Sequence, residues 1–290
     1  MEKRYFEIAG YVVSLSLEDS ALWERLGNYS PFICPESSNA VLEARQVASV
    51  GETEPEPLLV SADEGFPRIT IGKTVSGKWF FTMAPLHNRP TSCLCTASED
   101  FSSAEFEILD KRNAVFSINN VMMLLYALRT SSLGCLEVHA SVIMKGGKGV
   151  AFLGKSGTGK STHSRMWLEN IEGTELLNDD NPVVRCHEDG RIIIYGSPWS
   201  GKTPCYKKLS VPLAGFVRII QAPYNKIQRL SGFQAYACLY PSVSAYRPER
   251  KVADGIHDSL SRVAASIPFF NLECLPDGDA ARLSFKTIYG

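Results

Sequence analysis

Near the middle of the chain, consecutive residues have the types and spacing of a phosphate-binding loop, G-x-x-x-x-G-K-[ST]. They are Gly154, Lys155, Ser156, Gly157, Thr158, Gly159, Lys160 and Ser161. Glycines allow backbone N–H groups to turn inward around a polyphosphate, and a helix that begins at the loop adds its positive pole. The pattern predicts that Lys160 contacts the β- and γ-phosphates of a nucleotide, that Ser161 ligates Mg²⁺, and that Thr162 completes the nucleotide site.

The residues on either side predict the elements that position this loop. The apolar run Val150–Leu153 indicates a buried strand before it. After it, Thr162–Leu168 continues as a helix, which is expected to close before Gly173. An ordinary glycine-rich turn is the alternative interpretation of the loop. The strand that precedes the loop favours phosphate binding, because the motif requires that context.

A second strand is predicted to run beside the strand that leads into the loop. From Leu136 to Val142 apolar and polar residues alternate, and a lysine- and glycine-rich turn over 145–149 connects this strand to the next. The hairpin places His139 on a polar face next to the loop. A strand histidine is either a satisfied structural residue or a functional one, and its neighbours here make it a candidate.

Two adjacent carboxylates, Asp179 and Asp180, follow the next predicted strand, Thr174–Leu177. Pro182 prevents simple continuation of that strand, and ligands of α/β sheets bind at the carboxyl ends of strands. Adjacent carboxylates repel each other unless a cation or a proton neutralises one of the charges. We therefore expect one acid to be a ligand of Mg²⁺ and the other to be a general base. The alternative is an Asx-type turn with solvated acids.

A second hairpin is predicted from Val183 to Tyr195, with Asp-Gly in its turn. It leads into the loop Gly196–Lys202, whose serine and terminal lysine are suited to cover the phosphates or to hold an acceptor. Lys202 is therefore a candidate phosphate-binding residue. Trp199 fits this role and that of a buried core residue equally well.

A change of composition near residue 110 predicts two domains. Alternating segments such as Tyr5–Leu17 indicate a β-rich N-terminal domain over 1–112, interrupted by an acidic, proline-containing segment, Ser49–Glu64, that is expected to be an exposed loop. The nucleotide-binding domain is expected over 113–290. It begins with a helix that we expect Asn119–Asn120 to cap.

Composition excludes several classes of protein. With 290 residues, 44% of them hydrophobic and 21% charged, the chain has the composition of a soluble globular protein. A net charge of −1 gives no overall field toward nucleic acid or anionic membrane. The longest apolar stretch, Val121–Leu128, is too short to span a bilayer, and the N-terminus lacks the apolar run of a signal peptide, so we expect a cytoplasmic protein without nucleic-acid or membrane partners.

The eight cysteines are scattered, which favours reduced thiols over a disulfide framework in a chain this long. Only Cys93 and Cys95 are closely spaced. They lack a second pair or suitably spaced histidines, so a plain strand or loop is favoured over a zinc site.

Four motifs in the same order resemble the HPr kinase/phosphorylase-related branch of the phosphoenolpyruvate carboxykinase-like P-loop fold. They are His139-Ala140-Ser141, the loop and helix start over 154–163, Asp179-Asp180, and Gly196–Lys202. The similarity spans about residues 115 to 245. It implies an α/β domain with a mixed sheet, in which the phosphate loop is entered from an antiparallel hairpin.

The resemblance also implies an activity, namely transfer of the γ-phosphoryl group of ATP, with Mg²⁺, to a serine hydroxyl. It implies that Lys160 holds phosphates, that Ser161 and Asp180 serve the metal, and that Asp179 is the general base. His139 would assist beside the phosphates. Since phosphoryl transfer requires little covalent participation by the protein, positioning and charge neutralisation would supply most of the catalysis.

The chain departs from this family in ways that bear on its substrate. Bacterial HPr kinases carry an acidic signature after the second hairpin, whereas Gly196–Trp199 contains no acid, so a reverse phosphorylase reaction is not implied. The N-terminal half does not resemble the family's usual partner domain, so the expected acceptor is a serine of a carrier protein or peptide, not necessarily HPr. The alternatives are a kinase of a small hydroxylated metabolite such as free serine, and a non-catalytic ATP-binding scaffold. A homo-oligomer is compatible with each.

Overall fold

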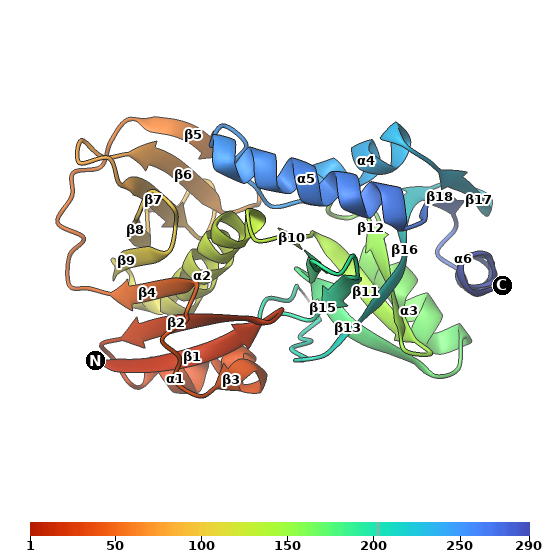
Figure 1. Ribbon diagram of the computed structural model, residues 1–290, viewed down its shortest axis with the longest axis horizontal. Coiled ribbons are helices and arrows are strands. Elements are labelled where there is room, and N and C mark those ends of the chain that lie inside the picture. Colours follow the sequence, from red (N-terminus) through yellow and green to blue (C-terminus); the bar gives the residue numbers. More distant parts are fainter. Residues whose placement is uncertain (202) are drawn as a thin grey trace. The chain divides into compact units, whose positions relative to one another are not determined.

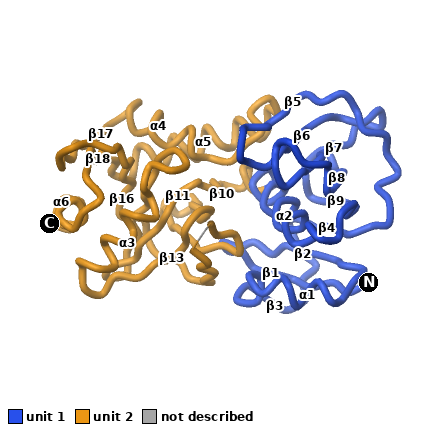
Figure 2. Tube along the Cα trace, turned by 180° about the vertical axis from the view of Figure 1, so that it is seen from behind, with its two compact units in different colours: residues 1–129 blue, residues 130–290 orange. Residues whose placement is uncertain are grey.

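The structure is a computed structural model that describes residues 1–201 and 203–290. The chain divides into two compact units, residues 1–129 and residues 130–290 (Figures 1 and 2). A mixed sheet of parallel and antiparallel strands forms the centre of each unit. The expectation of an α/β protein with a mixed sheet is therefore confirmed at this level.

The first unit is a nine-stranded sheet with the order β3-β1-β2-β4-β9-β8-β7-β6-β5. Its strands are β1 (Glu2–Ile8), β2 (Tyr11–Leu17), β3 (Ile33–Cys34), β4 (Leu42–Gln46), β5 (Pro57–Ser61), β6 (Arg68–Lys73), β7 (Trp79–Ala84), β8 (Cys93–Ala97) and β9 (Ser103–Ile108). The sheet is mixed because β4 runs parallel to both β2 and β9, while the other neighbours are antiparallel. The alternating segment Tyr5–Leu17 forms the hairpin of β1 and β2, which turns at Ala9 and Gly10 with φ of 49° and 77°.

The segment Ser49–Glu64, expected to be an exposed loop, contains strand β5. That expectation is wrong for Pro57–Ser61, which pairs antiparallel with β6. The proline stands at the first position of the strand, where a missing N–H is tolerated at a sheet edge. All five residues of β5 are nevertheless exposed.

The helices of the first unit are α1 (Leu22–Arg25), the 3₁₀ turns η1 (Gly27–Phe32) and η2 (Lys111–Asn113), and α2 (Ala114–Ser131). Asn119 and Asn120 do not cap α2, because the helix already begins at Ala114. The side chain of Asp110 accepts a hydrogen bond from the Arg112 N–H and caps the 3₁₀ turn that leads into α2. Up to Arg129, α2 belongs to the first unit; its Tyr126 hydroxyl is buried and donates to the Ile8 carbonyl at 3.0 Å.

In the second unit the path of the sheet is β10-β14-β15-β16-β12-β11-β13, and β18 joins it beside β16, with β17 paired to β18. The strands are β10 (Cys135–Glu137), β11 (Ala140–Lys145), β12 (Lys148–Leu153), β13 (Thr174–Asp180), β14 (Val183–Cys186), β15 (Ile192–Tyr195), β16 (Ser210–Gln221), β17 (Lys226–Leu230) and β18 (Phe269–Cys274). The predicted hairpin over Val183–Tyr195 is confirmed, since β14 and β15 pair antiparallel. Parallel pairing of β16 with β12 and β18 makes this sheet mixed.

The helices of the second unit are α3 (Lys160–Asn170), α4 (Phe233–Leu239), the 3₁₀ turn η3 (Tyr240–Ser242), α5 (Arg250–Ser266) and α6 (Gly278–Tyr289). Helices α3 and α6 pack together around Trp167, which is completely buried. The Trp167 ring lies 5.7 Å from the ring of Phe152 on β12 and 5.7 Å from that of Phe285 on α6. This packing fixes α3 against the sheet. No helix in the described part of the chain is long and apolar enough to cross a membrane.

The strand expected from Leu136 to Val142 is broken into two. β10 pairs with β14, whereas β11 pairs with β12 and β13, so the chain crosses from one part of the sheet to another at residues 138–139. The hydrogen bonds of the crossing are made with other loops, since the Val138 N–H donates to the Pro182 carbonyl and the His139 N–H to the Ser242 carbonyl. His139 therefore lies at the start of β11, not within a strand.

The order of β12, β11 and β13 brings distant residues to one edge of the sheet. β11 lies between the other two strands and is antiparallel to both. The carboxyl ends of β12 and β13 consequently lie at the same edge as the beginning of β11. That edge carries the glycine-rich loop, the two acids and His139.

Candidate functional site

The glycine-rich loop connects β12 to α3 in the order that the sequence predicts. Its glycines at 154, 157 and 159 have φ of 149°, 81° and 105°, in the range that favours glycine. A Cβ on Gly154 would lie 2.4 Å from the Thr158 hydroxyl oxygen. That hydroxyl donates to the Lys155 carbonyl at 2.8 Å and closes the loop on itself. The loop conformation therefore depends on glycine at its entry.

Lys160 is the first residue of α3, and its side chain folds back over the loop. Only 8% of the residue is exposed. The ammonium group donates to the Gly154 carbonyl at 3.0 Å and approaches the Nε2 atom of His139 at 2.9 Å. Burial lowers the pKa of Lys160, and the negative charges of Asp180 and Asp179 oppose that shift. The positive charge of Lys160 is thus held at the glycine-rich loop by groups from three elements.

His139 links the lysine to an acid. Its Nδ1 atom lies 2.9 Å from a carboxylate oxygen of Asp180. The Lys160 ammonium group can only donate hydrogen bonds, so the Nε2 atom of His139 accepts from it. The Nδ1 atom of His139 then carries the proton that is donated to Asp180. Asp180, His139 and Lys160 form one continuous chain of hydrogen bonds. The sequence places these residues at one edge but does not predict this direct chain.

Asp179 and Asp180 are the last residues of β13, which is longer than the predicted strand. They pair with Ser141 and Ala140 of β11. Asp179 is 4% exposed, while the Asp180 side chain is 32% exposed. The second oxygen of Asp180 accepts from the Asn181 side chain at 2.9 Å. The two acids consequently stand in different surroundings, as neighbours on a strand do.

The Asx-type turn considered for this segment is present, but Asn178 makes it. Its side-chain oxygen accepts from the N–H groups of Asp180 at 3.1 Å and of Asn181 at 3.0 Å. Asn178 is fully buried. The turn is made without the aspartate carboxylates, which remain available for other contacts.

The loop after β15 packs against the end of β13 through buried polar groups. Ser197 is completely buried, and its hydroxyl donates to the Asn181 carbonyl at 2.6 Å and accepts from the Trp199 N–H at 3.2 Å. The Gly201 N–H donates to the Asp179 carbonyl at 2.7 Å. Trp199 is 4% exposed, as expected of a core residue. Lys202, the candidate phosphate-binding lysine, lies outside the described residues.

Replacing Ser197 with alanine should lower the free energy of unfolding by about 1–3 kcal/mol, because it leaves buried backbone groups of this loop without partners. Thermal and denaturant unfolding measure the change. Ser132→Ala, at an exposed turn of the same unit, is the matched control and should change stability by about 0.5 kcal/mol or less. Equal stability of Ser197→Ala and Ser132→Ala would contradict a supporting role for the Ser197 hydroxyl.

Three hollows surround the glycine-rich loop. The first, of about 580 Å³, is lined by residues that include His139, Gly154, Lys155, Ser156, Gly157, Thr158, Arg218 and Ser242. The second, of about 410 Å³, is lined by residues that include Gly157, Gly159, Thr162, Ile219, Ala222, Leu275 and Pro276. The third, of about 270 Å³, is lined by Ser161, Thr162, Ser164, Arg165, Leu168, Leu176, Asp179 and Thr203. The loop and the first turn of α3 thus border space on several sides, and Ser161 shares a hollow with Asp179.

Glu137, at the end of β10, is a candidate functional residue that the sequence analysis does not identify. It is 2% exposed, and within residues 1–201 and 203–290 neither of its carboxyl oxygens has a hydrogen-bond partner. Burial raises the pKa of Glu137 well above its ordinary value, and the nearby charge of Asp180 raises it further. A buried acid beside Asp180 tends to retain its proton. Its one sequence signal is a lone acid between the apolar residues Leu136 and Val138.

Because the pKa of Glu137 is raised on folding, the carboxyl group destabilises the folded protein increasingly as the pH rises from its ordinary pKa to its raised pKa, and the penalty persists above that. Below the ordinary pKa, about 4.3, both states hold the proton and the penalty vanishes. Glu137→Gln should therefore gain stability relative to wild type as the pH rises from 4 to 8. Denaturant titrations across this range test it, with the exposed Glu169→Gln as control. A stability difference independent of pH would contradict the raised pKa.

The potential metal ligands of residues 1–201 and 203–290 are cysteine, histidine and acidic side chains. All eight cysteines are free thiols, and Cys93 and Cys95 are both buried in β8. In the described part of the chain no cluster of three or more histidine, cysteine or acidic side chains is arranged to hold a metal. Such a cluster is not needed for Mg²⁺ bound together with a nucleotide, because one or two carboxylates and the phosphates supply the ligands. Asp179, Asp180 and the Ser161 hydroxyl are oxygen donors of this kind.

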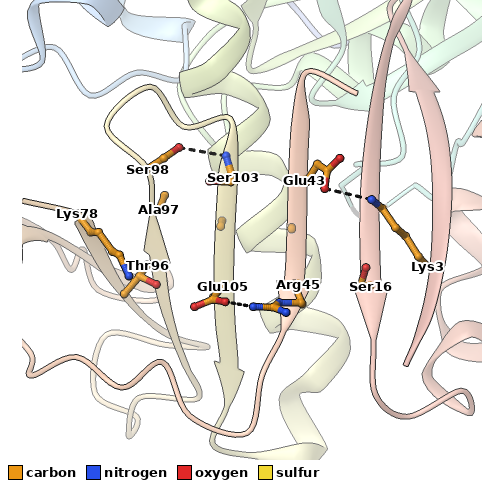
Figure 3. Close-up of a pocket in the computed structure, with 12 residues that line it drawn as sticks. Lys3, Ser16, Glu43, Arg45, Lys78, Thr96, Ala97, Ser98, Ser103 and Glu105 are labelled. Atoms are coloured by element: carbon orange, nitrogen blue, oxygen red, sulfur yellow. Dashed lines mark hydrogen bonds and ion pairs between the residues drawn. The ribbon is translucent and has the colours of Figure 1, made fainter. Parts of the chain in front are cut away.

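The first unit has a hollow of about 450 Å³ on one face of its sheet. Small residues such as Ser16 form its floor, and charged side chains lie across it (Figure 3). Lys3 pairs with Glu43 at 3.1 Å, and Arg45 pairs with Glu105. These charges neutralise each other in pairs.

A family model described as "SynChlorMet cassette protein ScmC" matches residues 106–279, more than half of the chain. The matched region contains the glycine-rich loop, His139 and both acids. No curated protein matches the sequence.

Proposed function

The chain belongs to the SynChlorMet cassette protein ScmC family, and we propose that it transfers the γ-phosphoryl group of ATP to a hydroxyl group, with Mg²⁺. The single observation that carries this proposal is the position of Lys160. It begins α3 directly after a glycine-rich loop, and its ammonium group is linked through His139 to Asp180. A cation, a helix N-terminus and an acid that meet at one sheet edge suit phosphoryl transfer, in which positioning and charge neutralisation do most of the work.

We further propose that the second unit is a P-loop kinase domain similar to those of HPr kinases. Three features support this. The strand before the loop forms an antiparallel hairpin with β11, the two acids end β13 beside it, and the helix begins at Lys160. The proposed fold and the proposed reaction stand together, because both depend on the same loop.

The phosphates of ATP would lie over the loop residues 154–159, at the N-terminus of α3. Lys160 already contacts backbone carbonyls there, and its donors would turn to the β- and γ-phosphates when ATP binds. Thr162 adds a hydroxyl at the first turn. The hollow of about 410 Å³ beside Thr162, lined partly by Ile219 and Pro276, has the partly apolar lining that suits a nucleoside. Lys202 stays a proposed phosphate ligand.

Ser161 and Asp180 would hold Mg²⁺, which when bound neutralises charge on the phosphate oxygens. The donor set fits, since both offer oxygen atoms and Asp180 is half-buried beside the proposed phosphate site. His139 keeps the Asp180 carboxylate oriented by donating to one of its oxygens. The same histidine accepts from Lys160 and so couples the metal ligand to the phosphate ligand.

Asp179 is the proposed general base. It lines a hollow of about 270 Å³ together with Ser161, Arg165 and Thr203, and this hollow offers a place for the acceptor. In the reaction a bond forms between the acceptor oxygen and the γ-phosphorus, the bond from that phosphorus to the β-phosphate oxygen breaks, and ADP leaves. The hydroxyl proton passes to the Asp179 carboxylate.

The proposed acceptor is a serine of a carrier protein or peptide. The hollow beside Asp179 is lined in part by the exposed Arg165, so the serine side chain of a polypeptide could enter it from the surface. A small hydroxylated metabolite such as free serine is the alternative acceptor. We place the reaction in the cytoplasm, where ATP is present and where the eight free cysteines would stay reduced.

Titration calorimetry with Mg·ATP and with Mg·GTP tests the nucleotide part of this proposal. We expect binding of one nucleotide per chain with a Kd between about 1 µM and 1 mM, the usual range for substrates. Lys148→Ala, which changes an exposed lysine at the start of β12, is the control and should bind equally well. If neither Mg·ATP nor Mg·GTP binds, the proposal is overturned.

A further inference from the structure

We propose that the free edge of β5 binds an extended, basic peptide segment of another protein by adding it as a further strand to the sheet of the first unit. The segment recognised would have a short apolar core of alternating side chains, flanked by lysine or arginine. This site belongs to the first unit alone, and it does not depend on the proposed phosphoryl transfer.

The outer edge of the sheet is unpaired over Leu58–Ser61 in the described part of the chain. β5 is the last strand in the sheet order, and within the described residues it pairs only with β6. Its three central apolar residues, Leu58, Leu59 and Val60, are 60%, 40% and 51% exposed. At the opposite end of the sheet, β3 has only the two residues Ile33–Cys34. One end of the sheet is therefore short and the other offers a row of backbone donors and acceptors.

The devices that protect an edge are confined to the first residues of β5, where Pro57 stands and the register shifts between Pro57 and Leu59. Lysine, central proline and inward charge normally prevent pairing there, whereas Leu58–Ser61 contains none of these. Leu59 lies opposite Ile71 and Val60 opposite Thr70, so successive apolar side chains project from the two faces of the sheet. An added strand would place its own alternating side chains beside both. Backbone hydrogen bonds supply the affinity in this mode of recognition, and the side chains supply the selectivity.

The charges that flank β5 favour a basic partner. Between residues 52 and 64 the chain has no lysine or arginine and contains the acids Glu52, Glu54, Glu56, Asp63 and Glu64. Glu52 lies 3.6 Å from Lys78, and the other four form no ion pair in the described part of the chain. Two copies of this strand would bring like charges together, which disfavours self-pairing. A peptide with basic flanks would instead be attracted at both ends of the strand.

The test uses the synthetic peptide KKVTVTVKK, fluorescently labelled, and the full-length protein. We expect saturable binding by anisotropy, with affinity falling at least about tenfold when the flanking lysines become glutamates or when the central valine becomes proline. Hydrogen exchange should show new protection of amides within Leu58–Ser61 when the peptide is added. Equal binding of all three peptides, or protection confined to other segments, would overturn the proposal.

Variants of the protein sharpen this test. Leu58→Ser/Val60→Ser should weaken binding about fivefold or more, whereas Leu109→Ser, at a leucine that is 49% exposed in the same unit, should not. Glu54→Gln/Glu56→Gln should weaken binding and reduce its salt dependence. Lys160→Ala should bind the peptide as wild type does, so failure here is distinct from failure of the kinase proposal. Concentration-dependent self-association that Leu58→Ser/Val60→Ser abolishes would show that a second copy occupies the edge, and would overturn the proposal.

Discussion

Replacing Lys160 with alanine should lower the rate of ATP turnover by about 10²–10³, the usual cost of losing one charged contact to a transition state. The buried ammonium group stands at the start of α3, in contact with the Gly154 carbonyl and His139. No other described lysine bonds to the loop in this way. Steady-state ATP consumption by wild type and variant gives the ratio.

Lys148→Ala is the control for Lys160→Ala, because it removes an exposed lysine from the strand that leads into the loop. It should turn over at the wild-type rate. Unfolding curves of both variants separate loss of chemistry from loss of fold. Normal turnover by folded Lys160→Ala would contradict the phosphate-binding role of the lysine.

The two adjacent acids should respond differently to the same substitution. Asp179→Asn should lower turnover by roughly 10²–10⁴, the worth of a positioned base, while Mg·ATP affinity stays within about threefold of wild type. Asp180→Asn should raise the Mg²⁺ concentration needed for half-maximal turnover, since Asp180 is the proposed metal ligand. Nucleotide affinity and Mg²⁺-dependent turnover are measured on both variants. The expected difference follows from their surroundings, because Asp180 bonds His139 whereas Asp179 lines the hollow with Ser161.

Loss of nucleotide binding by both variants to the same extent would identify the pair as a joint metal site. In that case the chain would be better described as a nucleotide sensor than as a kinase. Asp277→Asn changes a helix-capping acid far along the chain and controls for the general loss of a carboxylate. Because asparagine caps a helix about as well as aspartate, this variant should change stability by about 0.5 kcal/mol or less and leave the dependence on Mg²⁺ unaltered.

The sequence predicts the order of the elements that form this edge, because each has a strong local signal. Glycines at fixed spacing after an apolar run predict the strand, loop and helix of β12 and α3. The turn at 145–149 predicts the antiparallel pairing of β11 with β12. The presence of His139 at the same edge follows from that hairpin.

What the sequence does not predict depends on long-range pairing. Alternation from Leu136 to Val142 fits one strand, yet β10 and β11 pair with different partners, and no local pattern shows the crossing at His139. The same alternation makes Glu137 look like a residue on the polar face of a strand. In the described part of the chain its carboxyl group is instead buried without a hydrogen-bond partner.

Two further features were hidden by residues that have two possible roles. Asn119–Asn120 has the composition of a helix cap, but Asp110 earlier in the chain caps the turn that starts the helix. Pro57 and the acids around it suggest a loop, while the backbone of Pro57–Ser61 pairs with β6. Such residues are common both in loops and at edge strands, so only the pairing itself distinguishes the two.

The most direct measurement of the proposed function is the mass of the acceptor after incubation with purified protein, Mg²⁺ and ATP. Candidate acceptors are serine-containing peptides, a small carrier protein and free serine. We expect one acceptor to gain the mass of a single phosphoryl group on a serine, with ADP formed in equal amount, and Asp179→Asn to remove most of this product. If ATP fills the nucleotide site but stays intact with every acceptor, the assignment as a kinase is contradicted.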